Sequence, residues 1–336
     1  MEKKQFVNSI HYFRAVAIII IVSGHCFELI NFDNKNIVYK LITKSIQGGT
    51  AFFVFISGYL FYHIFYQNFN FKKFIIKKIK YVLVPYLFLT TILCLYLFFD
   101  TSQIFETSIL MIYLSGGIVS AYWYIPFIMI VFILSPLFIK FITLDNNQKI
   151  VFIIISLIIS LYIHRGNITT NPYAFLHNVI YYTPIYLMGI YVSINKKSIQ
   201  KKLKGKEFFI LILGFLTVIP YVINSTNNFL EYIKKADLMI LQKVFFIFFF
   251  FIFLERFENT KIKILNKLAE NSFGIFFIHC IYIQLIIKVM NSLNIEFRND
   301  YFIYILGTII VISLSLYTTL ITKKIFGKNS RYLIGN

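Results

Sequence analysis

The chain has 336 residues, of which 58% are hydrophobic and only 14% are charged. A soluble globular domain is about 45–50% apolar and about 25% charged, so this composition excludes a soluble enzyme and a disordered chain. The net charge of +19 comes from 33 Lys and Arg against 14 Asp and Glu, and in so apolar a chain it indicates membrane topology rather than nucleic-acid binding.

Ten membrane-spanning helices are predicted in chain order, since a span needs roughly 20 mostly apolar residues. They are Ile10–Ile30, Ile46–Tyr66, Tyr81–Phe99, Tyr122–Phe141, Ile150–His164, Leu176–Ile194, Phe208–Ile223, Leu238–Leu254, Ser272–Met290 and Tyr301–Ile321. Glu106–Ser120 is a weaker candidate for a surface or re-entrant helix, because Gly116 and Gly117 interrupt it. No connection is long enough for a separate soluble domain, so we expect residues 1–336 to form one all-α, polytopic membrane domain.

Lys and Arg in the connecting segments predict how the spans are oriented. With the N-terminus inside, 23 of them lie on the inner side and seven on the outer side. Both termini are therefore expected in the cytoplasm. A cleaved signal peptide is not expected, because Arg14 interrupts the first apolar run and no small-x-small cleavage site follows.

Ionisable residues inside a span are costly and are therefore candidates for function. The first predicted span contains His11, Arg14, His25 and Glu28. Arg14 and His25 are eleven residues apart, which places them about 20° from eclipsed on one helix face and roughly 16 Å apart along the axis. Glu28 follows His25 by three residues, so its carboxylate can accept the second N–H of the imidazole.

This pattern is suited to acyl transfer. A neutral imidazole can take the proton of an attacking hydroxyl, and a carboxylate behind it stabilises the imidazolium. Arg14 can bind a phosphate or a carbonyl of the acyl donor. The alternative is that Arg14 extends to the membrane interface and His25 only packs in the bundle, and composition alone leaves both interpretations open.

Five motifs occur in order along the chain. They are Phe13–His25 with its Arg-x10-His spacing, Gly49–Tyr59, Lys77–Tyr86, Trp123–Pro126 and Ser272–His279. Together they resemble the membrane-bound acyltransferase-3 family, which includes enzymes that O-acylate bacterial surface polysaccharides. The chain departs from the family pattern at Ala51, Tyr81 and Ala121, where many members have aspartate, arginine and histidine.

The resemblance implies an O-acetyltransferase that moves an acetyl group from cytoplasmic acetyl-CoA to a hydroxyl of a cell-surface or lipid-linked polysaccharide, such as an O-antigen or a capsule. His25 is then the general base, with Glu28 in support, and Arg14 engages the acyl donor. The expected location is the bacterial cytoplasmic (inner) membrane, and the expected partners are acetyl-CoA, the glycan acceptor and membrane lipids, with no nucleic acid.

Two other functions remain open at this point. One is an exporter of a surface polysaccharide such as poly-N-acetylglucosamine. The other is a small-molecule transporter in which Arg14 and His25 form a relay, although no internal repeat supports it.

The basic segment offers the expected phosphate contacts of coenzyme A, from Lys77, Lys78 and Lys80. Lysine would act there as a point charge. A lysine run at this position also fits positive-inside topology and contact with lipid headgroups.

Acceptor contacts are expected from residues of the other motifs, namely Ser57, Trp123, Tyr124 and His279. Each has a simpler alternative in packing: close helix contact for the serine, an aromatic interface belt for the two aromatic residues, and an interhelical hydrogen bond for the histidine. No Gly-x-Ser-x-Gly elbow supports an acyl-serine mechanism.

We expect no metal site. The pairs His25-Cys26 and His279-Cys280 suggest zinc ligands, but adjacent helical residues point about 100° apart. Each helix would therefore offer only one ligand, which is too few for a closed zinc site.

The charge asymmetry gives a topology prediction. A reporter fused after Asn336 should read cytoplasmic, and one inserted near Asn227, between the seventh and eighth predicted spans, should read external. Paired alkaline phosphatase and fluorescent-protein fusions measure this directly. Both reporters on one side would contradict the ten-span topology.

Overall fold

The computed structural model describes residues 6–34, 36–101, 108–167, 171–223 and 235–335. This part of the chain is all-helical, apart from one isolated bridge between Asn31 and Arg298. Several residues used in the topology argument lie outside the described residues: Lys3, Lys4, Lys35, Lys234, Asn227, Asn336 and the beginning of Glu106–Ser120.

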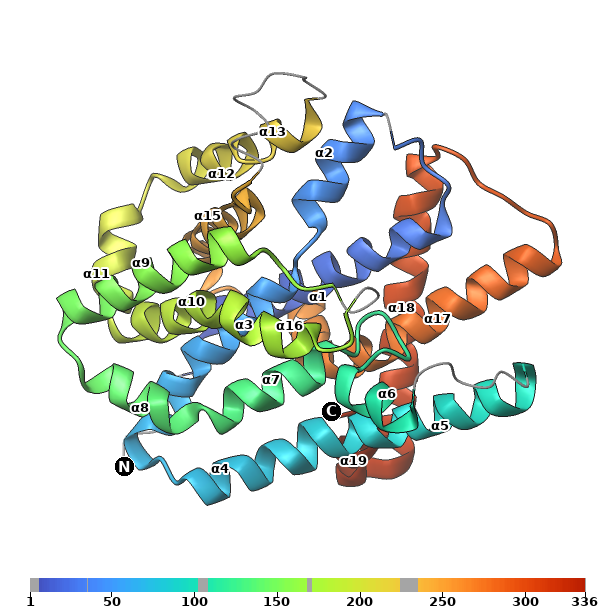
Figure 1. Ribbon diagram of the computed structural model, residues 1–336, viewed down its shortest axis with the longest axis horizontal. Coiled ribbons are helices and arrows are strands. Elements are labelled where there is room, and N and C mark those ends of the chain that lie inside the picture. Colours follow the sequence, from blue (N-terminus) through green and yellow to red (C-terminus); the bar gives the residue numbers. More distant parts are fainter. Residues whose placement is uncertain (1–5, 35, 102–107, 168–170, 224–234, 336) are drawn as a thin grey trace.

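The helices follow one another with short connections (Figure 1). They are α1 (Asn8–Cys26), α2 (Ile37–Ile46), α3 (Thr50–Leu60), α4 (Phe71–Lys78), α5 (Val84–Thr101), α6 (Ile109–Ser115), α7 (Tyr124–Ile133), α8 (Ser135–Thr143), α9 (Asn146–Ile163), α10 (Ala174–Ile194), α11 (Lys196–Leu203), α12 (Glu207–Leu216), α13 (Ile219–Val222), α15 (Leu238–Phe253), α16 (Lys263–Glu270), α17 (Ser272–Ser292), α18 (Tyr301–Phe326) and α19 (Ser330–Ile334). Shorter helical turns extend several of them: Phe27–Leu29, Phe61–Phe65, Tyr66–Asn68, Ile79–Leu83, Leu254–Phe257 and Gly327–Asn329.

Seven helical segments in the described part of the chain are long and apolar enough to cross a membrane. They are Asn8–Leu29, Ile37–Asn68, Phe71–Phe99, Asn146–Ile163, Leu238–Phe257, Ser272–Ser292 and Tyr301–Ile334. Two bent pairs bring the number to nine if each is one span: α7 with α8, bent by 54°, and Lys196–Leu203 with Glu207–Val222, bent by 84°. The polytopic, all-helical membrane bundle is therefore confirmed, with fewer spans than the ten predicted.

The sixth predicted span, Leu176–Ile194, falls on α10, which is not among these segments. This helix has 21 residues, but His177, Asn178 and four tyrosines make it less apolar than the other spans. It packs against α3, α7 and α9, and most of its side chains are buried inside the protein. Polar side chains are tolerated here because neighbouring helices, rather than lipid, surround them.

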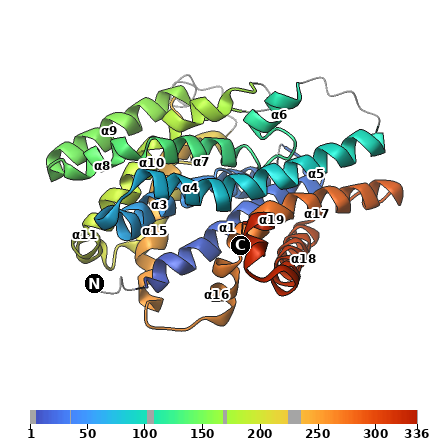
Figure 2. The same ribbon diagram turned by 90° about the horizontal axis from the view of Figure 1, so that it is seen from below.

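Helix α1 occupies the interior of the bundle and contacts α3, α16, α17 and α18 (Figures 1 and 2). Its first turn has no local side-chain cap. Instead, the backbone N–H groups of Asn8 and Ser9 donate to the Glu258 carboxylate, each at 2.8 Å. Burial alone would raise the pKa of Glu258, but the hydrogen bonds from Ser9 and Asn8 outweigh it and lower the pKa. A distant carboxylate thus anchors the start of α1.

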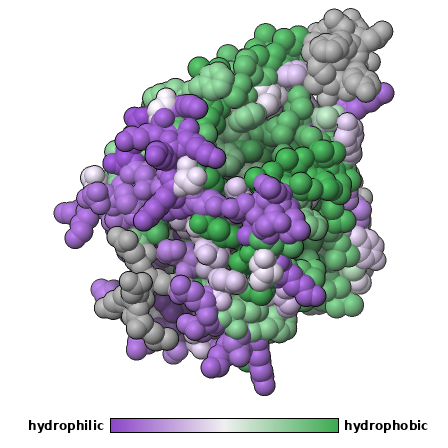
Figure 3. Space-filling model, turned by 90° about the vertical axis from the view of Figure 1, so that its left-hand side faces the viewer, coloured by the Kyte–Doolittle hydropathy of each residue, from purple (hydrophilic) through white to green (hydrophobic). Residues whose placement is uncertain are grey.

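The outer helices expose apolar side chains. Val151, Phe152 and Ile155 on α9 are each more than half exposed, as are Phe98 and Phe99 on α5. Figure 3 shows a broad apolar area over much of one face, with hydrophilic residues gathered along one side. An exposed apolar area of this kind is what contact with lipid requires.

Close contact between α3 and α10 depends on small residues. A Cβ atom at Gly189 would overlap the backbone oxygen of Phe55 and lie 2.8 Å from the backbone nitrogen of Tyr59. Because backbone atoms cannot move aside, we expect Gly189→Ala to destabilise the protein by about 1–3 kcal/mol. Thermal unfolding in detergent measures the effect.

Gly307→Ala is the matched control on α18. Its added methyl would meet only the end of the Leu29 side chain, at 3.0 Å, and a flexible side chain can adjust. Equal melting temperatures for Gly189→Ala and Gly307→Ala would show that the close approach of the two backbones at Gly189 does not stabilise the packing of α3 against α10.

Candidate active site

His25 lies in the last turn of α1, where the helix meets the turn Phe27–Leu29. Its Nδ1 is 3.6 Å from Glu28 Oε1 and 3.2 Å from Ser120 Oγ. The side chain is 24% exposed, and its Nε2 has no hydrogen-bond partner among the described residues. An imidazole held through Nδ1 with Nε2 free has the arrangement of an acid–base group.

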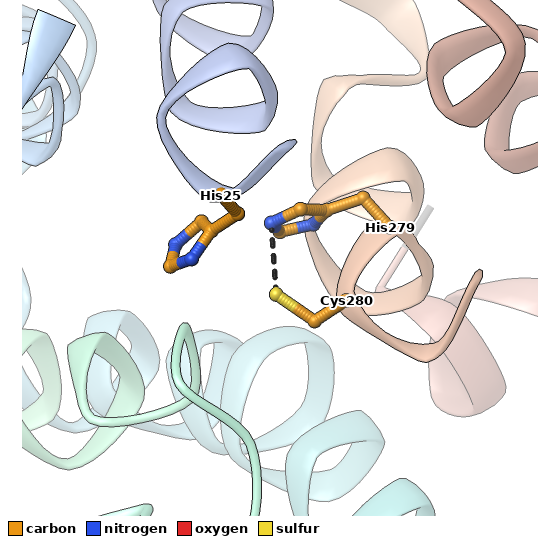
Figure 4. A group of neighbouring side chains, drawn as sticks. All are labelled: His25, His279 and Cys280. Atoms are coloured by element: carbon orange, nitrogen blue, oxygen red, sulfur yellow. Dashed lines mark hydrogen bonds between the residues drawn. The ribbon is translucent and has the colours of Figure 1, made fainter. Parts of the chain in front are cut away.

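His279 and Cys280 on α17 point towards the same space (Figure 4). The rings of His25 and His279 have centroids 5.3 Å apart. His279 Nδ1 donates to the backbone oxygens of Phe276 and Ile275, at 2.8 and 3.1 Å. Its Nε2 is therefore an acceptor, and the Cys280 thiol lies 3.2 Å from it. His279 is fully buried, and its uncharged imidazole packs beside the imidazole of His25.

The geometric argument against a metal site was wrong for one pair. His279 Nε2 and Cys280 Sγ reach the same space although they are adjacent on a helix, and with His25 they offer three ligand atoms within 4.8 Å of one another. The hydrogen bonds already explain the cluster, since the thiol can donate to Nε2 and Ser120 joins Cys280 to His25. The absence of a metal remains a prediction.

A pocket of about 200 Å³, here called the His25 pocket, opens beside the imidazole. Its walls come from α1, the chain between α2 and α3, the start of α7 and the Arg165 loop that joins α9 to α10. The residues that line it are Ile20, Ile21, Gly24, His25, Ile46, Gln47, Gly48, Gly49, Thr50, Ala121, Trp123, Arg165 and Phe276. A ligand in this pocket would contact His25 directly.

Arg14 lines a second and larger cavity, here called the Arg14 cavity, of about 1010 Å³. Its guanidinium donates to Ser272 Oγ at 3.1 Å and forms no ion pair with a described residue. Three further cations line the same cavity, Lys323, Lys328 and Arg331, against one carboxylate, Glu270. Four cations and one acid make this a site for a large anion.

The lysines of the basic segment lie elsewhere. None of Lys77, Lys78 and Lys80 lines the Arg14 cavity, and only Tyr81 of their segment does. Lys77 and Lys80 are exposed. The Lys78 ammonium lies 4.2 Å from the ring centre of Phe132, with the rings of Phe65 and Phe74 at 5.3 and 5.2 Å, which is a cation–π arrangement.

The predicted acceptor residues are divided between two levels of the bundle. Trp123 lines the His25 pocket and His279 lies beside His25, whereas neither Ser57 nor Tyr124 lines either opening. Tyr124 lies close to Ser57 and within electrostatic reach of Arg14. Trp123 is only 5% exposed, so its ring is not a free surface on which a sugar can stack.

Sequence reasoning missed Ser120, Arg165 and the cations of the C-terminal segment. Ser120 and Arg165 are in connecting loops, where hydropathy and helical periodicity carry no signal about three-dimensional position. Lys323, Lys328 and Arg331 were visible only as cytoplasmic charge. Their role in lining the Arg14 cavity depends on how α18 and α19 turn back towards α1.

Comparison with known proteins gives one family match. A family model described as an acyltransferase domain matches residues 7–321, which is nearly the whole chain. No curated protein and no solved structure matches the chain significantly. The matched range includes Arg14, His25 and every residue that lines the His25 pocket, but only four of the thirteen residues that line the Arg14 cavity, namely His11, Arg14, Tyr81 and Glu270.

Proposed function

The chain belongs to the acyltransferase-3 family, and on this premise we propose that this membrane acyltransferase is an O-acetyltransferase that moves an acetyl group from acetyl-CoA to a glycan hydroxyl. The observation that carries the proposal is the pair of openings along α1. One is a cationic cavity at Arg14, and the other is a pocket at His25 with Nε2 available. The acceptor is a cell-surface or lipid-linked polysaccharide, and the enzyme lies in the bacterial cytoplasmic membrane.

Charge supports coenzyme A as the donor in the Arg14 cavity. Coenzyme A carries several phosphate charges, and Arg14, Lys323, Lys328 and Arg331 supply cations around one cavity. Arginine binds phosphate through paired N–H groups, while lysine contributes a point charge. Both chain termini are expected in the cytoplasm, so α19 would place this cavity where cytoplasmic acetyl-CoA can enter.

The reaction takes place at the His25 end. The acceptor hydroxyl gives its proton to His25 Nε2 while its oxygen bonds to the acetyl carbonyl carbon. The C–S bond breaks, and the coenzyme A thiolate takes the proton back from the imidazolium. Glu28, 3.6 Å from Nδ1, stabilises the imidazolium that forms between these steps. The flexible arm of the donor has to cover the distance between Arg14 and His25, roughly 16 Å along the helix.

Replacing His25 tests the general base. His25→Ala should fold and insert, because a smaller and less polar side chain suits a span, while acetyl transfer should fall by about 10²–10⁴-fold. Glu28→Gln should cost less, since it weakens charge support but leaves the base in place. The measurement is glycan O-acetyl content, by mass spectrometry, at matched membrane abundance.

Normal acetylation by His25→Ala would remove the general-base assignment. The polysaccharide exporter would then be the better hypothesis. His63→Ala is a suitable control, because this histidine lies after α3 in the turn Phe61–Phe65 and lines neither opening; it should acetylate at the normal rate.

Donor binding is tested with two double variants, each of which removes two cations from the predicted cytoplasmic side of the membrane. Lys328→Gln with Arg331→Gln should raise the Michaelis constant for acetyl-CoA at least tenfold with little change in kcat, since charge-assisted hydrogen bonds contribute about 1.5–3 kcal/mol each. Lys77→Gln with Lys80→Gln should change it less than threefold. The reverse order would place the coenzyme phosphates at the basic segment.

A further inference from the structure

We propose that the acceptor carries an anionic group, a carboxylate or a phosphate, and that Arg165 and Lys243 form its subsite next to the His25 pocket. The inference rests on the proposed function, because it takes the His25 pocket as the acceptor site. Arg165 lines this pocket and also an adjoining one of about 130 Å³ that contains Lys243. Gln47 and Gly48 line both as well, so the two pockets share a wall.

The Arg165 loop is held in place by α10. The side chain of Asn178, which is fully buried, accepts from Gly166 N at 2.9 Å and donates to Gly166 O at 3.2 Å. His177 Nε2 donates to the backbone oxygen of His164 at 2.8 Å. A Cβ atom at Gly166 would come within 3.0 Å of Ala174, so glycine allows this close approach. Arg165 is therefore positioned by buried polar contacts.

The guanidinium of Arg165 is oriented but has no hydrogen-bond partner. Its central carbon lies 5.0 Å from the ring centre of Trp123, which also stacks on Tyr182 with ring centres 6.1 Å apart. No described residue accepts a hydrogen bond from Arg165 or pairs with it. Five N–H donors fixed at the edge of a pocket suit bidentate binding of a carboxylate or phosphate.

Lys243 supplies the second cation from α15. It is 3% exposed, and its ammonium donates to the backbone oxygen of Ser45 at 2.8 Å, which uses one of its three donors. The charges of Arg165 and Asp237 both act on this ammonium. A buried ammonium that makes one hydrogen bond to the described residues is stabilised by binding a further acceptor.

Asp237 does not neutralise the two cations. It is the one carboxylate among the residues that line the two pockets, and both of its oxygens are used. Oδ2 accepts from the Tyr181 hydroxyl at 2.8 Å, and Oδ1 accepts from Met239 N at 3.0 Å, where it caps α15. The linings therefore keep a net charge of +1, which favours an anionic ligand over a neutral sugar.

The single tryptophan of the chain, Trp123, reports on this subsite because Arg165 stacks on it. The purified protein in detergent, with saturating coenzyme A to occupy the donor site, is titrated with glucuronate, glucose 1-phosphate and glucose. We expect saturable fluorescence changes with the two anions and at least tenfold weaker binding of glucose. The anion with the lower Kd indicates whether the acceptor is an acidic sugar or a phosphate-bearing glycan.

Variants separate the subsite from the rest of the protein. Lys243→Gln keeps the Arg165–Trp123 contact and should raise the Kd of the anions at least tenfold. Arg165→Gln should also raise the Kd at least tenfold. Its binding is measured by calorimetry, because the substitution changes the surroundings of the Trp123 fluorophore. Since Arg165 lies in a loop, we expect the variant to fold. Arg298→Gln removes a cation from the same predicted side, outside both pockets, and should leave Kd unchanged.

Equal binding of glucose and glucuronate, or equal Kd values for all three variants, would overturn the subsite. His25→Ala distinguishes this from a failure of the proposed function. It should bind the anions normally while losing acetyl transfer. If acetyl transfer depends on His25 but the sugars bind equally well whatever their charge, the subsite is overturned and the proposed function stands.

Discussion

The rigid axis of α1 is the constraint on which the rest of the site depends. Arg14 and His25 belong to one uninterrupted helix, so the distance between the two openings is set by the rise of about 1.5 Å per residue. The Glu258 carboxylate fixes the start of this helix, and α3, α16, α17 and α18 pack around it. The two openings therefore keep a fixed separation along one helix.

Cations from segments distant in the sequence meet at both openings. At the Arg14 cavity they come from α1 and the C-terminal helices, and at the His25 pocket and the pocket adjoining it they come from the α9–α10 loop and α15. In both places arginine N–H groups remain without a full set of acceptors from the described residues. Of these cations only Lys243 is fully buried, and for it the cost of a buried charge without a counter-ion is highest.

The sequence predicted the helical bundle, the position of Arg14 and His25 on one helix and the approach of Glu28 to His25, because hydropathy and helical periodicity act within one segment. It did not predict the bend between α7 and α8, and it counted α10 as a span although this helix is less apolar than the others. It could not place Arg165 beside Trp123 or Cys280 beside His279 Nε2. Those contacts depend on loop paths and side-chain rotamers, which periodicity does not encode.

The polar character of α10 has a consequence for biogenesis. Asn178, His177 and the tyrosines make this segment a poor substrate for partitioning from the translocon into lipid by itself. Its main partners α3, α7 and α9 all precede it in the chain and are synthesised first. We therefore expect α10 to insert during synthesis by packing against these earlier helices, which have to be present near the translocon at that time.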